Sequence, residues 1–313
     1  MACPPLVAVA HGSTDPRAGA AVADLISLVR SRAAVRGWPG LDARAAFLGH
    51  APPSAAQVLG ALAGRPPDHG TAGHGTAGHG APYRPARDGD ARSRPVVVLP
   101  LLLTAAYHSG TDIPGALREA QAAYPGLAIS YGEPLGPHPA LMRALDRRLA
   151  EAGQDGRAGH TSVVLAAAGS SRTAANAAVA RMAADWQQAS RWRAVVPAYA
   201  SAAGPTPEQA VTALLHDGAR RVVVATYLLA PGLFADRIRA GSLAAGAAAV
   251  SGPLGAAPEV ADLLLQRYAE ARTVPVLQNG AVAQNGAVLR NGPGARLPGS
   301  PAWPLATRAS AQC

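Results

Sequence analysis

The sequence predicts an α/β protein made of two tandem copies of one parallel-sheet domain. Short runs of Val, Leu and Ala alternate with longer amphipathic segments, which is the pattern of βα units on a parallel sheet. The same order of segments then occurs a second time, and a Pro-Leu-Gly turn stands at the same place in both copies, at 134–136 and 253–255. The 313 residues, 49% hydrophobic and 15% charged, allow each copy to bury its own core.

In the first copy, apolar runs of strand length mark the strands. Capping residues such as Ser13, Thr14, Asp15 and Asp112 precede the helices. In chain order the elements expected are a strand at 6–10, a helix at 17–35, a strand at 43–48, a helix at 54–63, a strand at 96–103, a helix at 113–123, a strand at 127–131 and a helix at 139–152.

The second copy repeats this order after residue 155. Its expected elements are a strand at 162–167, a helix at 173–188, a strand at 193–199, a helix at 207–215, a strand at 221–228, a helix from about 235, a strand at 247–251 and a helix at 258–271. We therefore expect an N-terminal domain over 1–155 and a C-terminal domain over 156–272.

The first copy is longer than the second, and residues 66–94 account for almost all of the excess. This stretch is rich in Gly and His, repeats His-Gly-Thr-Ala-Gly, and has almost no large apolar side chains, so it cannot pack a core. Its three regularly spaced histidines, His69, His74 and His79, could deliver a divalent metal. Replication slippage that left a harmless surface loop is the favoured interpretation.

The tail over 273–313 is rich in Gly, Pro, Asn and Arg, and we expect it to be disordered. Cys3 and Cys313 are the two cysteines, too few for a disulfide framework. The first apolar run is too short for a signal sequence or a membrane span, so the expected location is the cytoplasm, away from membranes.

The net charge is +9, and every one of the 28 basic residues is arginine. These arginines are scattered, no nucleic-acid-binding motif is present and only 4% of the residues are aromatic, so we expect no nucleic-acid partner. A polyanionic small molecule is one use for the charge, and coding bias is an equally good explanation.

Histidines follow two strands of the first copy and are replaced in the second. His11 follows the strand at 6–10 and His108 follows the strand at 96–103, whereas the matching positions hold Ala168 and Phe234. Because ligands bind at the carboxyl ends of parallel strands, the two imidazoles are expected to converge on one site. Neutral imidazole can bind Fe, Co, Ni or Zn and can also accept a proton near neutral pH.

The motif His11-Gly12-Ser13 also suits an anion-binding turn, but Gly-Ser persists at 169–170 without the histidine, so Gly12 and Ser13 are assigned mainly to the turn and the helix cap. A phosphate-binding α/β enzyme is the weaker hypothesis, because no nucleotide fingerprint follows a strand. His138 matches Ala257 in the second copy, and its expected role is peripheral.

Together these motifs resemble the sirohydrochlorin chelatases, the class II tetrapyrrole chelatases of the CbiX and SirB type. The resemblance rests on His-Gly-Ser after the first strand, on a Phe-Leu strand with a later Pro-Ser, on Pro-Leu-Leu-Leu followed by His and Asp-Ile-Pro, and on Pro-Leu-Gly. It implies two flavodoxin-like domains around a cleft and insertion of ferrous iron or cobalt into sirohydrochlorin for sirohaem or cobalamin. His11 and His108 would bind the metal and accept protons, and arginines lining the cleft could pair with substrate carboxylates.

One position departs from the family pattern. The family often carries an acidic residue after the Phe-Leu strand, whereas here Gly49 and His50 follow it. His50 could supply a third metal ligand or could only line the cleft. The function expected is a lyase-type chelatase without a permanently bound cofactor, whose substrates are a tetrapyrrole and a divalent metal. The alternative is a non-catalytic carrier of metal or tetrapyrrole.

Overall fold

The structure, a computed structural model, describes residues 3–64, 94–104, 113–154, 160–273, 283–284 and 287–288. The elements of the first copy are β1 (Leu6–Ala10), α1 (Pro16–Val35), β2 (Ala43–Phe47), α2 (Ala55–Leu62), β3 (Arg94–Pro100), α3 (Ile113–Ala123), β4 (Leu127–Tyr131) and α4 (Pro139–Glu151). Those of the second copy are β5 (Thr161–Ala167), α5 (Thr173–Ala189), β6 (Ala194–Tyr199), α6 (Pro207–His216), β7 (Arg221–Tyr227), α7 (Leu233–Ala244), β8 (Ala249–Val250) and α8 (Pro258–Arg272).

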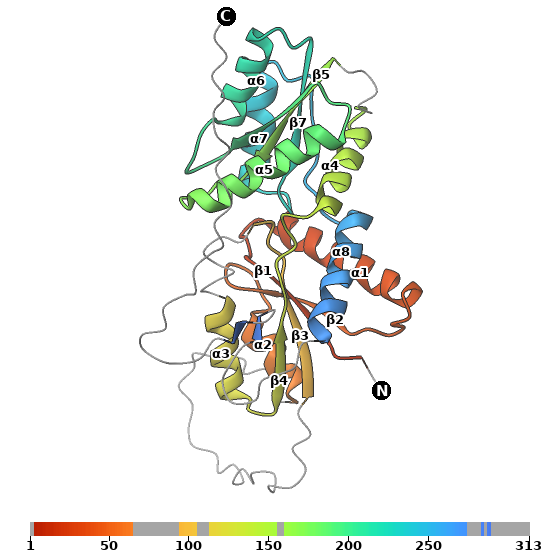
Figure 1. Cartoon of the computed structure of the whole chain (residues 1–313). Coiled ribbons are helices and arrows are strands. Elements are labelled where there is room, and N and C mark those ends of the chain that lie inside the picture. Colours follow the sequence, from red (N-terminus) through yellow and green to blue (C-terminus); the bar gives the residue numbers. More distant parts are fainter. Residues whose placement is uncertain are drawn as a thin grey trace, which may run out of the picture.

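The two copies form two parallel sheets of the same topology, one in each lobe of the molecule (Figure 1). The first sheet has the order β4-β3-β1-β2 and the second the order β8-β7-β5-β6, so corresponding strands occupy corresponding places. This is the strand order of doubly wound flavodoxin-like folds. Strands β1, β4 and β5 are wholly buried and read as continuous apolar runs because helices cover both faces of each sheet, whereas the edge strands β2 and β6 are only partly buried. The predicted fold class, two tandem α/β domains related by duplication, is confirmed.

Most element boundaries lie within two residues of the prediction, and the clearest differences are in β3, α7 and β8. Strand β3 ends at Pro100, although the Leu101 amide still donates to the Val9 carbonyl of β1, and Leu103 contacts the other lobe through its carbonyl. Helix α7 begins at Leu233, two residues before the expected start, and β8 has only two residues. Residue Arg94, placed at the end of the predicted insert, is the first residue of β3, and the rest of the insert lies outside the described residues.

Part of the expected tail also forms a strand pair. Strands β9 (Ala283–Gln284) and β10 (Ala287–Val288) form an antiparallel pair, and β9 extends the first sheet beside β4. The sequence did not predict this pair, and the remainder of 274–313 lies outside the described residues.

The last helix of each copy packs on the sheet of the other copy. Helix α8 packs against α1, β3 and β4, and the Tyr268 hydroxyl donates to the Pro4 carbonyl at 2.8 Å. Helix α4 packs against β7 of the second sheet and against α8. Its Asp146 accepts hydrogen bonds from the indole nitrogens of Trp186 (3.2 Å) and Trp192 (3.3 Å), and burial raises the pKa of this carboxyl. The lobes seen in Figure 1 therefore differ from the sequence repeats by an exchange of α4 and α8.

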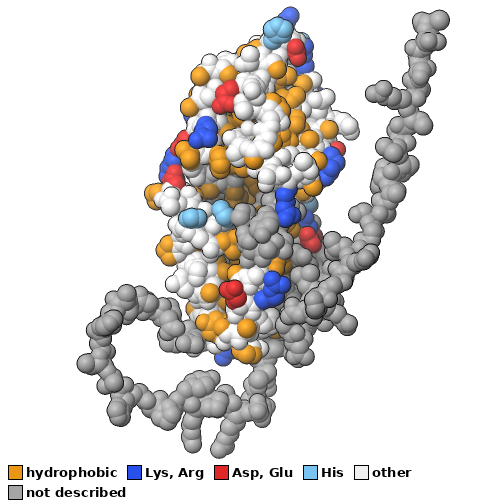
Figure 2. Space-filling view, turned by 90° about the vertical axis from the view of Figure 1, so that its left-hand side faces the viewer, with side chains coloured by type: hydrophobic (Ala, Val, Ile, Leu, Met, Phe, Trp, Pro, Cys, Tyr) orange, Lys and Arg blue, Asp and Glu red, His pale blue; other side chains and the backbone are white. Residues whose placement is uncertain are grey.

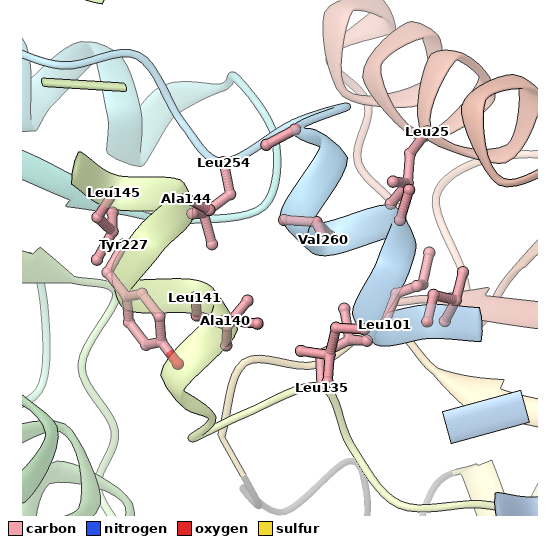
Figure 3. Close-up of a cluster of buried hydrophobic side chains, with 14 of the residues drawn as sticks. Leu25, Leu101, Leu135, Ala140, Leu141, Ala144, Leu145, Tyr227, Leu254 and Val260 are labelled. Atoms are coloured by element: carbon pink, nitrogen blue, oxygen red, sulfur yellow. The ribbon is translucent and has the colours of Figure 1, made fainter. Parts of the chain in front are cut away.

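This exchange joins the lobes through a continuous apolar core. Figure 3 shows Leu141 and Ala144 of α4 facing Val260 of α8, with Leu101 of the first copy close by. The buried Tyr227 hydroxyl donates to the Leu103 carbonyl across the lobes at 2.8 Å. Fully burying a large apolar side chain contributes roughly 1.5–3 kcal/mol, so this shared cluster holds the two lobes as one body.

Candidate functional site

His11 lies at the carboxyl edge of the first sheet, directly after the buried strand β1. The next residue, Gly12, has a φ of +91°, and a Cβ atom there would lie 1.8 Å from the carbonyl oxygen of Gly49. Only glycine permits this close approach of the β1–α1 turn to the loop after β2. The Gly49 amide donates to the His11 carbonyl at 3.2 Å, which fixes the two loops to one another.

His50, the residue at the position that departs from the family pattern, lies beside His11. The two ring centroids are 6.2 Å apart, the ring planes meet at 62°, and both side chains are exposed. His50 has a φ of +60°, in the left-handed region that non-glycine residues rarely adopt. The loop that imposes this conformation is held at both ends, because the Leu48 amide donates to the Ala10 carbonyl and the Phe47 amide to the Pro53 carbonyl.

His108, the other predicted metal-binding and catalytic residue, lies in the stretch 105–112, outside the described residues. Its neighbours on either side are described. Leu101 and Leu102 reach the same cleft as His11, and α3 begins at Ile113. Over the described part of the chain, no group of three or more His, Cys, Asp and Glu side chains could hold a metal ion.

A cleft of about 540 Å³ lies between the lobes, and both His11 and His50 line it. The first copy lines it with the ends of β1 and β2 and the first turn of α1, and the second copy lines it with residues 228–235. A smaller cavity of about 280 Å³ shares His11, Leu101 and Leu228 with it. In Figure 2, histidine side chains lie beside hydrophobic ones at the level where the lobes meet.

The expectation that arginines line this cleft does not hold for its described lining, which contains neither arginine nor a carboxylate. The nearest charges stand at the rim. Arg17 of α1 donates to Asp236 of α7 at 2.6 Å and also to Asp15, which caps α1. The hydrogen bond from Arg17 lowers the pKa of Asp15, and the two carboxylates raise the pKa of Arg17. This bridge joins the lobes beside the cleft.

The second copy repeats the backbone of the site without its imidazoles. Gly169 has a φ of +85°, and a Cβ atom there would lie 1.9 Å from the carbonyl oxygen of Ser201. The Ser201 amide donates to the Ala168 carbonyl at 2.9 Å, as the Gly49 amide does to His11. Ala202, with a φ of +57°, takes the place of His50. His50 is therefore a further histidine that the second copy lacks.

A signal for this correspondence was present in the sequence. Helix α2 begins with a capping box of Ser54 and Gln57, and α6 begins with one of Thr206 and Gln209. His50 and Ala202 each lie four residues before the cap, so aligning the two boxes pairs them. An alignment of the copies at the first and third strands alone does not show this pair.

His138, for which a peripheral role was expected, is the N-cap of α4. Its Nδ1 accepts a hydrogen bond from the Ala140 amide at 3.1 Å, which requires the unprotonated nitrogen. Burial, together with the positive charges of Arg267 and Arg143, lowers the pKa of His138. It is not among the residues that line the cleft.

Two parallel α/β lobes with exchanged terminal helices, and imidazoles at the strand ends between them, define a chelatase-type fold. The family model CbiX matches residues 89–152 and 162–271, more than half of the sequence. The chain belongs to the CbiX family.

Solved structures and curated relatives agree with this family. SirB from Bacillus subtilis with Fe3+ superposes with a TM-score of 0.66 at 23% identity, over 87% of this chain and 96% of that one. A structure of CbiX described as the terminal enzyme of sirohaem biosynthesis in denitrifying bacteria gives a TM-score of 0.55 at 20% identity, covering 85% of this chain and 99% of the other. At such identities these structures show the shared fold.

Among curated proteins, a sirohydrochlorin cobaltochelatase of Priestia megaterium is 30% identical over 46% of this chain and 47% of its own length. A sirohydrochlorin ferrochelatase of Bacillus subtilis is 29% identical over 46% of this chain and 54% of its own. The match thus spans about half the length of these relatives. None of the described helices is long and apolar enough to cross a membrane.

Proposed function

We propose that this protein is a chelatase that inserts a divalent metal ion, ferrous iron or cobalt, into sirohydrochlorin. The observation that carries the proposal is that His11 and His50 lie side by side in the cleft, at the strand ends of the N-terminal copy (1–155). The second copy has alanine at both matching positions. The names of the curated relatives supply the substrate. The product would serve sirohaem or cobalamin synthesis in the cytoplasm.

The reaction needs a transient metal ligand and a proton acceptor on one face of the ring. Two pyrrole N–H protons leave as the metal ion enters, and neutral imidazole nitrogen can bind the ion first and accept a proton afterwards. We assign these roles to His11 and His108, with His50 as a third ligand. The metal ion is a substrate that must leave with the product, which suits a site of few ligands with open positions.

The direct test follows metal insertion by the absorbance of the tetrapyrrole. Variants His11→Ala, His50→Ala and His108→Ala are compared with His216→Ala, whose histidine is 90% exposed and lies outside the cleft. We expect the His11→Ala, His108→Ala double variant to lose at least 100-fold in rate, in the range removed with a general acid or base. Undiminished activity in that double variant would refute the site assignment. Rates with ferrous iron and cobalt, measured in one assay, would identify the preferred metal.

A second candidate, a non-catalytic carrier of metal or tetrapyrrole, is favoured by one observation. The described cleft lining holds no carboxylate to share the proton transfer with the imidazoles. A carrier would bind metal or sirohydrochlorin stoichiometrically and give no insertion rate above the uncatalysed background. The same absorbance assay, run with substrate in large excess, separates the two functions, because only the chelatase turns over more than once.

A further inference from the structure

The first turn of α7 presents two large apolar side chains to the cleft, although they remain exposed. Leu233 is 69% and Phe234 is 39% exposed, and both line the cleft together with His11 and His50. The other exposed large hydrophobic residues of the described chain, Val35 and Leu243, do not line it. Exposed apolar surface inside a cleft is typical of a ligand site, because a bound ligand would remove that surface from water.

The position of this turn relative to the histidines is fixed. Asp236, two residues after Phe234, binds the Arg17 guanidinium at 2.6 Å, and Arg17 lies in the first turn of α1, which begins five residues after His11. The same bridge therefore ties α7 to the turn that carries the imidazole. Phe234 is also the residue that the sequence alignment pairs with His108, so the second copy has an apolar ring where the first has an imidazole.

We propose that Leu233 and Phe234 form a platform for one face of the sirohydrochlorin macrocycle, while the histidines of the first copy approach the metal-accepting nitrogens. This inference rests on the proposed function and adds a positioning role for the second copy. A tetrapyrrole has a broad apolar face and an anionic periphery, and an aromatic ring packs against such a face by offset stacking. The described residues that line the cleft include no Arg, Asp or Glu that would contact the apolar face, and the volume of the cleft lies in the range of small-molecule sites.

The test measures binding of sirohydrochlorin without metal, by quenching of its fluorescence, together with separate KM values for sirohydrochlorin and for the metal ion. Phe234→Ala and Leu233→Ala are compared with Leu243→Ala, which truncates a 42% exposed leucine of the same helix outside the cleft. For Phe234→Ala we expect about 10-fold weaker binding and a similar rise in KM for sirohydrochlorin, with KM for the metal within about twofold of the wild type. Phe234→Leu should recover most of the binding.

Because these side chains are exposed, the variants are expected to fold, with thermal midpoints within about 2 °C of the wild type. Equal binding by wild type, Phe234→Ala and Leu233→Ala would overturn the platform and leave the proposed function standing if the wild type still inserts metal. A wild-type protein that neither binds nor metallates sirohydrochlorin would overturn both. Equal losses in Phe234→Ala and Leu243→Ala would also overturn the platform, because the effect would then be a general property of α7.

Discussion

The two glycines that hold the corresponding turns of the copies allow a matched test of where the chemistry lies. Gly12→Ala places a Cβ atom 1.8 Å from the Gly49 carbonyl oxygen, and Gly169→Ala places one 1.9 Å from that of Ser201. Both residues also have a positive φ, +91° and +85°. The two substitutions thus impose nearly the same local strain on opposite copies, and they differ in that Gly12 directly follows His11 whereas Gly169 directly follows Ala168.

The magnitude follows from two contributions. An alanine in a left-handed conformation costs roughly 1–2 kcal/mol, and an overlap with backbone that the structure must relieve costs typically about 1–3 kcal/mol. Each variant should therefore lose about 2–5 kcal/mol of unfolding free energy, a large part of the roughly 5–15 kcal/mol typical of a domain. Relief of the overlap moves the Gly49–His50 loop by about 1 Å, and a misplacement of that size can reduce a rate about 100-fold.

The assay combines urea unfolding with metal insertion at a temperature at which both variants are folded by circular dichroism. We expect similar unfolding free energies, an insertion rate reduced about 100-fold in Gly12→Ala, and a rate within about threefold of the wild type in Gly169→Ala. If Gly169→Ala lost as much activity as Gly12→Ala while folded, strain in either copy would be sufficient, and the assignment of the site to the first copy would be wrong.

Three further substitutions test features outside the imidazole pair. The pKa of His138 is lower in the folded protein than its usual 6.5, so as the pH falls the unfolded chain protonates this residue before the folded chain does. The contribution of His138 to the unfolding free energy is therefore complete above pH 6.5 and is lost as the pH falls below that value. His138→Asn keeps a cap acceptor and should flatten this part of the stability curve in denaturant titrations; an unchanged slope would contradict the capping role. Asp146→Ala leaves two buried indole N–H groups unsatisfied and should lower the unfolding free energy by about 1–3 kcal/mol in urea, with no loss of insertion rate at saturating substrates. Tyr227→Phe removes the hydrogen bond to Leu103 across the lobes and should cost about 1 kcal/mol by the same measurement, whereas a neutral result would mean that water replaces the hydroxyl.

The strands and helices were predictable because their patterns are local. Five consecutive apolar residues at 6–10 define β1, and the caps at Asp15 and Ser54 mark where α1 and α2 begin. The parallel direction of the strands in each sheet also follows from the βα alternation and from its repetition in the second copy. These features depend on short-range periodicity and on connection rules, which the sequence contains directly.

The exchange of α4 and α8 was not predictable in the same way. Both helices are amphipathic, so either sheet could cover their apolar faces, and the pattern does not say which one does. In the structure the indole nitrogens of the second lobe bind Asp146 of α4, and Arg32 and Arg36 of the first lobe bind Asp262 of α8. These contacts join residues that are distant in sequence.

The positions of the arginines around the site were also not predictable from the sequence. Composition gives a net charge of +9 but does not locate it, and some of the arginines bind carboxylates of the protein itself, as Arg147 binds Glu259 at 2.6 Å. Arg17 is similarly bound to Asp236. An excess of positive charge therefore did not imply arginines inside the cleft.

The proposed reaction gives a reason for the asymmetry between the copies, because metal insertion needs ligands on one face of the ring. Two identical copies facing one cleft would place ligands on both faces of a flat substrate, and a metal ion bound from both sides would be released slowly. With His11 and His50 in one copy and Ala168 and Ala202 in the other, the proposed metal ligands lie on one face. The duplicated turn persists in the second copy because its glycine and its loop hydrogen bonds maintain the fold, whereas an imidazole there would have no role in the proposed reaction. The exchanged helices and the shared core then keep the face that carries the histidines at a fixed distance from the apolar face of α7.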